Sequence, residues 1–220
     1  MQDDRSTPAR SPRRGRPRSF DLDAATAAAL RTLWTKGYEA TTVEDLAEAT
    51  GLSASSLYAA FGSKHGVLQA ALARYDRDRD ELLGSLEHGT AGLDDLYGFL
   101  DRVRRGVTEP GSPGCFMVNT ATEVAPRDER IADHAHRYRE RVRDGIAAAL
   151  RRALDRGELP HMGPEEILGR ARLLQAALYG AQVAARSGAS QEALHTVGAL
   201  ERQIEQWATA SSPARPATGS

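Results

Sequence analysis

The stretch TTVEDLAEATGLSASSLYAAFGSKHGVL, residues 41–68, decides the fold of this chain. Thr42 and Asp45 have the residue types and the spacing of a helix capping box, so a short helix is expected to begin here. Gly51 suits the left-handed position that ends such a helix, and Ser53 is a second N-cap for a helix over residues 54–60. Two short helices joined by a glycine-containing turn indicate a helix-turn-helix, whose second helix enters the DNA major groove.

The composition is that of a globular chain of one or two domains. Of the 220 residues, 40% are hydrophobic and 27% are charged. No apolar run approaches the roughly 18 residues that suggest a membrane span, and the N-terminus lacks the apolar centre of a signal peptide. A single cysteine excludes an intramolecular disulfide, so we expect a cytoplasmic protein with no membrane partner.

The two ends of the chain have no helical pattern. Residues 1–19 carry six arginines against two aspartates, which predicts a disordered basic arm. Beside a helix-turn-helix, Arg16 and Arg18 of this arm are candidates to lie along phosphates or in a minor groove, although a plain solvated tail is the alternative. Residues 211–220 are expected to be a disordered polar tail.

Apolar residues at three-to-four spacing predict helices for the rest of the chain, over residues 22–36, 64–83, 93–107, 115–124, 128–156, 165–187 and 191–209. The charge-alternating second half of the 64–83 helix, RYDRDRDELL, is interpreted as a solvated connector, and residues 84–92 as a break. No strand pattern is present. The prediction is an all-α chain of about nine helices, with a three-helix DNA-binding head at 20–66 and an effector-binding and dimerisation body at 67–210.

The head resembles the DNA-binding domain of the TetR/AcrR family of one-component transcriptional repressors. The resemblance is carried by W-x-x-G-Y-x-x-T-T (Trp34 to Thr42), D-L-A (Asp45 to Ala47) and G-L-S-x-S-S-L-Y-x-x-F-x-S-K (Gly51 to Lys64). It implies a homodimeric repressor that binds a palindromic double-stranded DNA operator and is released by a small-molecule effector. The body resembles the family only in helix number and length, apart from one local segment around its cysteine.

Physical chemistry and the resemblance together nominate DNA-contacting residues. Lys64 stands at a helix start, where a cation is unfavourable unless a phosphate lies beside it, and the Tyr58 phenol is expected to reach a phosphate. The alanines of the second helix carry no bidentate donors, which leaves the operator sequence open. The full DNA-binding set is Arg16, Arg18, Thr41, Thr42, Ser53, Ala54, Ser55, Ser56, Tyr58, Ala59, Ala60 and Lys64.

The resemblance implies that the last two helices form a four-helix dimer seam, although packing within one chain would produce the same pattern. The seam residues are Leu173, Leu174, Ala177, Leu178, Ala181, Leu194, Val197, Leu200, Ile204 and Trp207. It also implies an effector cavity among the body helices, for which core packing is again the alternative. The cavity candidates are Leu96, Phe99, Leu100, Val103, Phe116, Met117, Tyr138, Gln175 and Tyr179.

The segment GCFMVNTATEVAP, residues 114–126, resembles the G-C-x-x-V-N-x-A-x-E segment of a subgroup of the family, some members of which sense electrophiles or oxidants. Cys115 is expected at a helix N-terminus, where the helix dipole favours the reactive thiolate. It is therefore a candidate sensor thiol, and a small buried hydrophobic residue is the alternative.

Other classes of protein fit the sequence less well. No catalytic motif, phosphate loop or zinc-binding cysteine set is present, so we expect no enzyme, no cofactor and no metal. His134 and His136 are two residues apart and would point in different directions on a helix. A ligand-free architectural DNA binder would not need the long body. A sequence-specific activator remains an alternative to a repressor.

Overall fold

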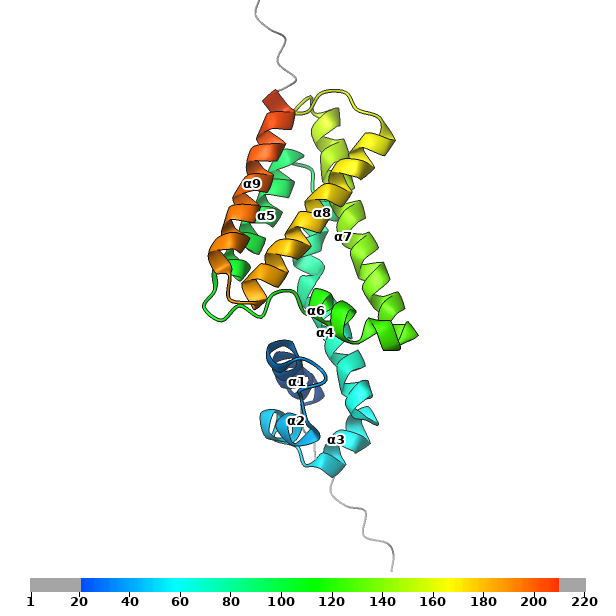
Figure 1. Ribbon diagram of the computed structural model, residues 1–220. Helices are drawn as coiled ribbons and strands as arrows, with labels where there is room; N and C mark the ends of the chain where they lie inside the picture. The colour runs from blue at the N-terminus through cyan, green and yellow to red at the C-terminus, as the bar shows by residue number, and fades with distance from the viewer. Residues whose placement is uncertain (1–20, 210–220) are drawn as a thin grey trace, which may run out of the picture.

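A computed structural model describes residues 21–209, which form nine α-helices and one short 3-10 helix, and no strand occurs within that range. The predicted all-α fold is confirmed. One end of the molecule is the head, α1–α3, the other end is the body, α5–α9, and the long α4 runs between them (Figure 1). The helices are α1 (Leu22–Lys36), α2 (Val43–Thr50), α3 (Ala54–Phe61), α4 (Lys64–His88), α5 (Leu93–Thr108), α6 (Phe116–Glu123), η1 (Ala125–Arg127), α7 (Glu129–Asp155), α8 (Pro164–Arg186) and α9 (Ser190–Thr209).

Local capping chemistry sets the helices of the head. The Thr42 hydroxyl accepts a hydrogen bond from the Asp45 amide, and the Asp45 carboxylate accepts one from the Thr42 amide, which completes the predicted capping box. Gly51 ends α2 at φ 68°, a left-handed conformation that glycine adopts without a Cβ penalty. Leu33, Leu46 and Leu57, one from each helix, are buried together in the head core.

Helix α4 is longer than its sequence indicates. The predicted break at residues 84–92 is wrong at its start, because α4 continues through Gly84 to His88. A glycine inside a helix costs about 1 kcal/mol, whereas burying a leucine side chain gains roughly 1.5–3 kcal/mol. Leu83 and Leu86 on either side of Gly84 are both fully buried, so tertiary packing outweighs the local cost. Residues 84–88 are therefore a packed part of α4 and not a break. The charge-alternating stretch before them does run between head and body, and Arg77, Asp78, Asp80 and Glu81 in it are exposed.

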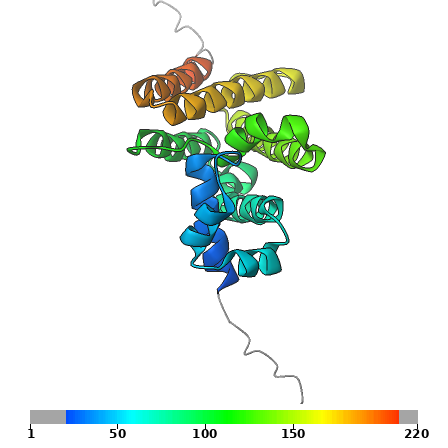
Figure 2. The same ribbon diagram turned by 60° about the horizontal axis from the view of Figure 1, so that its bottom comes forward.

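The body is a bundle in which α8 and α9 pack against each other and form one outer layer, with α5 and α7 beneath them (Figure 2). The short helix α6 lies between the body and the head (Figure 1). None of the helices described is long and apolar enough to cross a membrane.

Candidate DNA-binding surface and effector cavity

Helix α3 presents one face to solvent and packs the other into the head. Leu57 is 3% exposed, whereas Tyr58 is 49% exposed. Ser53 accepts a hydrogen bond from the Ser56 amide, and its hydroxyl lies 2.9 Å from the hydroxyls of Ser55 and Ser56. Of the remaining predicted contact residues on α3, Ala54 and Ala59 are exposed and Ala60 is half-buried. This face therefore offers one large phenol among small residues and hydroxyls.

The structure gives the residues that flank α3 different surroundings. Thr42 is exposed and caps α2, whereas Thr41 is buried and its hydroxyl donates to the Gly37 carbonyl. That bond gives Thr41 a structural role in place of the expected phosphate contact. The Lys64 ammonium lies 4.5 Å from the centre of the Tyr38 ring and 3.5 Å from the Glu39 carbonyl oxygen. These two contacts compensate a cation at a helix start without a phosphate.

Arg16 and Arg18, which were predicted to contact DNA from the basic arm, lie outside the described residues.

A cavity of about 690 Å³ lies among α4, α5, α7, α8 and the loop before α6, with α1 of the head at its edge. A volume of this size is typical of small-molecule sites. Among the predicted cavity residues, the structure brings four to its wall: Phe99, Val103, Tyr138 and Tyr179. The others are buried but do not line it: Leu96, Leu100, Phe116, Met117 and Gln175. Gln175 instead donates a hydrogen bond to the Arg139 carbonyl oxygen at 2.6 Å.

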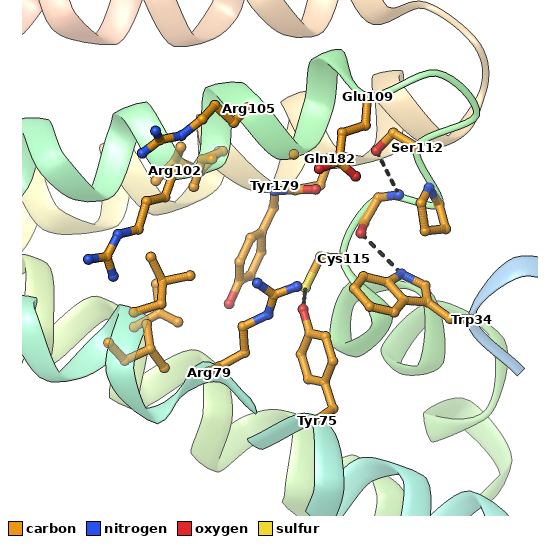
Figure 3. Close-up of a pocket in the computed structure, with 18 of the residues that line it drawn as sticks. Trp34, Tyr75, Arg79, Arg102, Arg105, Glu109, Ser112, Cys115, Tyr179 and Gln182 are labelled. Carbon is orange, nitrogen blue, oxygen red and sulfur yellow. Dashed lines mark hydrogen bonds between the residues drawn. The ribbon is translucent and has the colours of Figure 1, made fainter. Parts of the chain in front are cut away.

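Phenols, a thiol and a guanidinium meet at the inner end of this cavity (Figure 3). The Tyr75 hydroxyl lies 3.3 Å from the Cys115 sulfur, and both side chains are buried. The Arg79 guanidinium lies 4.9 Å from the centre of the Tyr75 ring and 5.6 Å from that of Trp34. Burial, and then the neighbouring Cys115, raise the pKa of Tyr75, and burial likewise raises the pKa of Tyr179. The phenols of the cavity therefore remain protonated donors at neutral pH.

Cys115 is the N-cap residue of α6, as expected from its position in the sequence, but its side chain makes no capping hydrogen bond. It is 8% exposed and lines the cavity. The preceding Gly114, at φ 71°, accepts a hydrogen bond through its carbonyl from the Trp34 indole at 3.1 Å. The wall of the cavity is thus bonded directly to α1 of the head.

The other end of α6 holds the head through Glu123. Its carboxylate accepts hydrogen bonds from two consecutive backbone amides of the head, at 3.1 Å from Tyr38 and 2.8 Å from Glu39. Helix α6 is therefore preceded by Cys115, whose thiol lines the cavity. It ends at Glu123, whose carboxylate binds the head. Helix α6 is thus bonded directly to the α1–α2 loop.

The predicted dimer-seam residues divide between the core and the surface. Six of them are buried within the chain: Leu174, Leu178, Ala181, Val197, Leu200 and Ile204. Ala177, Leu194 and Trp207 are half-buried, and the Arg170 guanidinium covers the Trp207 ring at 4.5 Å. Leu173 is 54% exposed, and Val183, which was not predicted, is 51% exposed. Between them the same face of α8 exposes the small residues Ala176 and Gly180.

Sequence reasoning missed Arg79 and Glu123. Arg79 stands within the charge-alternating segment that was interpreted as solvated. Arg79 lies four residues after Tyr75 and seven residues before Leu86. This helical spacing could have placed Arg79 on the inward face. Glu123 bonds to residues more than 80 positions away in the sequence, and no local pattern signals such a contact.

Comparison with known protein families gives two matches. Residues 25–71 match the model of the bacterial regulatory proteins of the tetR family, and residues 92–200 match the model of a tetracyclin repressor-like C-terminal domain. The first match covers the helix-turn-helix, and the second covers most of the body that surrounds the cavity.

Individual transcriptional regulators are also similar to this chain. The HTH-type transcriptional repressor ComR of Escherichia coli K12 is 35% identical over 190 residues, 82% of this chain and 87% of ComR. The uncharacterized HTH-type transcriptional regulator YezE of Bacillus subtilis 168 is 28% identical over 149 residues, 66% of this chain and 76% of YezE. A cysteine mutant of the TetR family regulator CifR, solved with 26-base-pair operator DNA, has a TM-score of 0.74 at 28% identity, covering 87% of this chain and all of that one.

Proposed function

Because this chain belongs to the TetR family of bacterial transcriptional regulators, and so is a regulator and not an enzyme, we propose that it is a homodimeric repressor that a small molecule releases from a palindromic operator. The observation that carries the proposal is the intact helix-turn-helix whose second helix exposes Tyr58 and the small residues beside it. A helix with such a face fits the major groove, where small side chains allow close approach to base edges.

In this proposal the head, residues 20–66, supplies the DNA contacts. Tyr58 and Thr42 donate hydroxyl hydrogen bonds to phosphates, and Lys64 turns from the Tyr38 ring to the DNA backbone. The ring is a weaker partner for an exposed ammonium than a phosphate anion. Arg16 and Arg18 add contacts from the N-terminal arm.

Dimerisation uses the outer face of α8, together with α9, within residues 67–210. The exposed Leu173 and Val183 on that face support this assignment, because two large apolar side chains in one row favour burial against a second copy. A two-fold axis through α8 would place the same residues of both chains against each other, as isologous dimers do. Two linked heads then read two half-sites.

Release is a population shift that runs through α6. A ligand that enters the cavity contacts the loop before α6, and α6 ends at the Glu123 carboxylate on the head. A ligand that favours a second position of α6 also favours a second spacing of the two heads, which no longer match successive major grooves. The length and continuity of α4 give the head a rigid lever for the same movement.

Cys115 supports a second mode of release, by electrophiles. The thiol lines the cavity beside the Tyr75 hydroxyl, so a reagent that fills the cavity meets it directly. With N-ethylmaleimide the sulfur adds across the maleimide double bond and the thiol proton passes to the adjacent carbon. If the reagent lowers operator affinity of the wild type but not of Cys115→Ser, the thiol is the sensor. If it affects neither protein or both equally, this mode is refuted.

The proposed function is tested by selecting DNA from a random library with the purified full-length protein. We expect one palindrome to be enriched, and we expect its affinity to fall in Tyr58→Phe. The matched control is Tyr97→Phe on α5, whose phenol lies in the body, and it should bind the palindrome as the wild type does. Binding that is salt-sensitive but enriches no sequence would contradict operator recognition.

A further inference from the structure

The wall of the cavity is strongly cationic. Four arginines line it, Arg31, Arg79, Arg102 and Arg105, against one carboxylate, that of Glu109. Figure 3 labels Arg79, Arg102, Arg105 and Glu109. A cavity lined by one sign of charge attracts ligands of the other sign and holds them more strongly where water is excluded. The charge of the wall is therefore a property that the ligand must match.

The four arginines differ in whether a carboxylate already pairs with them. Arg102 and Arg105 are ion-paired outside the cavity, to Glu81 at 3.9 Å and to Asp101 at 2.6 Å. For Arg79, no carboxylate within residues 21–209 lies within 4 Å of its guanidinium nitrogens. Its neighbours are the aromatic rings of Trp34 and Tyr75. Arg79 is a charged group deep in the site with room for an anion.

The rest of the wall is apolar. Leu82 and Leu83 of α4, Phe99 and Val103 of α5, and Leu178 of α8 line the cavity beside Arg79. A fully polar ligand such as inorganic phosphate would offer these side chains no apolar surface to pack against. A fully apolar ligand would displace water from the guanidinium without replacing its hydrogen bonds, which is costly.

We propose that the effector is an organic anion whose carboxylate pairs with the Arg79 guanidinium and whose apolar body lies against the side chains of α5 and α8. The inference rests on the proposed function in one respect, that this cavity is the effector site. A planar carboxylate matches the guanidinium fork with two parallel hydrogen bonds. The arginines nearer the surface raise the local concentration of anions at the entrance and disfavour cations.

Two fluorescent probes of similar shape test the charge preference on the full-length protein. 8-Anilinonaphthalene-1-sulfonate is an anion, and N-phenyl-1-naphthylamine has the same aromatic body without the charge. We expect the anion to bind more tightly than the neutral probe, and its affinity to fall roughly tenfold or more in Arg79→Gln, the loss typical of a charged hydrogen-bond partner. Affinity for the neutral probe should not fall in that variant.

The matched control is Arg77→Gln, which removes an arginine of the same helix. Arg77 is exposed, pairs with Asp23 at 3.8 Å and does not line the cavity. Arg79→Lys keeps a charge and should retain a preference for the anion, which separates a lost charge from a damaged fold. Displacement of the anionic probe by decanoate, decyl phosphate and decanol then ranks the head groups, and decanoate is expected to compete best. Equal affinity of both probes for the wild type, or anion binding that is the same in Arg79→Gln, would overturn the proposal.

Operator affinity is measured in parallel, on the palindrome selected above. Anion binding without operator binding would refute the proposed function and leave the ligand class standing. Operator binding with no charge preference in the cavity would refute the ligand class and leave the proposed function standing. If decanoate lowers operator affinity of the wild type and not of Arg79→Gln, both are supported together.

Discussion

Replacing Glu123 by alanine tests how the body holds the head. The Glu123 carboxylate accepts hydrogen bonds from the Tyr38 amide at 3.1 Å and from the Glu39 amide at 2.8 Å. Both amides precede α2, and the truncated side chain would leave them with water as their partner. We expect the α1–α2 loop to open more often in this variant while the helices of the head stay folded.

The size of the effect follows from the two bonds. Hydrogen bonds to charged groups contribute about 1.5–3 kcal/mol each, and the partial exposure of Glu123 favours the lower end. Since about 1.4 kcal/mol is a factor of ten in an equilibrium constant, each amide should become roughly tenfold more open. Loss of both bonds should lower the free energy of unfolding by about 3 kcal/mol, twice the lower end of that range. The ion pair between Arg127 and Glu39, at 3.6 Å, remains to keep the head near the body.

Hydrogen exchange of the Tyr38 and Glu39 amides measures this opening directly. The matched control is Glu129→Ala, because Glu129 is exposed and its side chain makes no hydrogen bond or ion pair with residues 21–209. Exchange should rise about tenfold in Glu123→Ala and stay near the wild-type rate in the control. Operator affinity should also fall in Glu123→Ala, since the head is no longer held in one orientation. Unchanged exchange at both amides in a folded variant would refute the role given to α6.

Four further changes have expected outcomes. Lys64→Ala should weaken operator binding and reduce the slope of log affinity against log salt by about 1, measured by titration at several salt concentrations, and an unchanged slope would show that Lys64 meets no phosphate. Leu173→Glu should sediment as a monomer where the wild type sediments as a dimer, because the two-fold axis would bring buried like charges together. Gly114→Ala should lower thermal stability by about 1–2 kcal/mol or more, since φ is 71° and a Cβ would lie 2.5 Å from the Gln182 carbonyl oxygen. For Glu158, burial acts to raise the pKa, but hydrogen bonds from a backbone amide and an arginine hold the pKa below its ordinary value, so its stabilisation is present near neutral pH and lost on acidification. Glu158→Gln should therefore melt below the wild type at pH 7, and the two melting temperatures should converge in strongly acidic buffer.

The head could be predicted from the sequence because its structure is local. The bond between Thr42 and Asp45 and the left-handed turn at Gly51 each depend on residues a few positions apart. Their chemistry is the same in any tertiary context. The start of α4 after Ser63 follows the same logic, since the Ser63 hydroxyl accepts a hydrogen bond from the Gly66 amide.

The body could be predicted only in outline because its contacts are not local. Helix α8 is apolar on more than one side, so periodicity does not say which side meets its own chain. Leu174 and Leu178 turn inward, whereas Leu173 and Val183 face out. The end of α4 was missed for a related reason, because Gly84 is a local signal that the burial of distant side chains overrides.

The charged residues of the cavity are also difficult to predict from the local sequence. An arginine amid alternating charges is typical of a solvated face, and most such residues are indeed exposed. Arg79 differs because α4 passes between the head and the body, where Trp34 and Tyr75 offer their rings to the guanidinium. Tyr75 lies in the segment itself, one helical turn before Arg79, whereas the contact with Trp34 follows only from the fold.

A footprint on the selected operator is the most direct test that two heads read DNA together. The account predicts two protected patches on one face of the duplex, separated by about one helical turn, roughly 10 base pairs, or a multiple of it. It also predicts two chains bound per duplex, with both patches lost together in Leu173→Glu. A single protected half-site, bound by one chain with the same affinity in the wild type and in Leu173→Glu, would contradict the account.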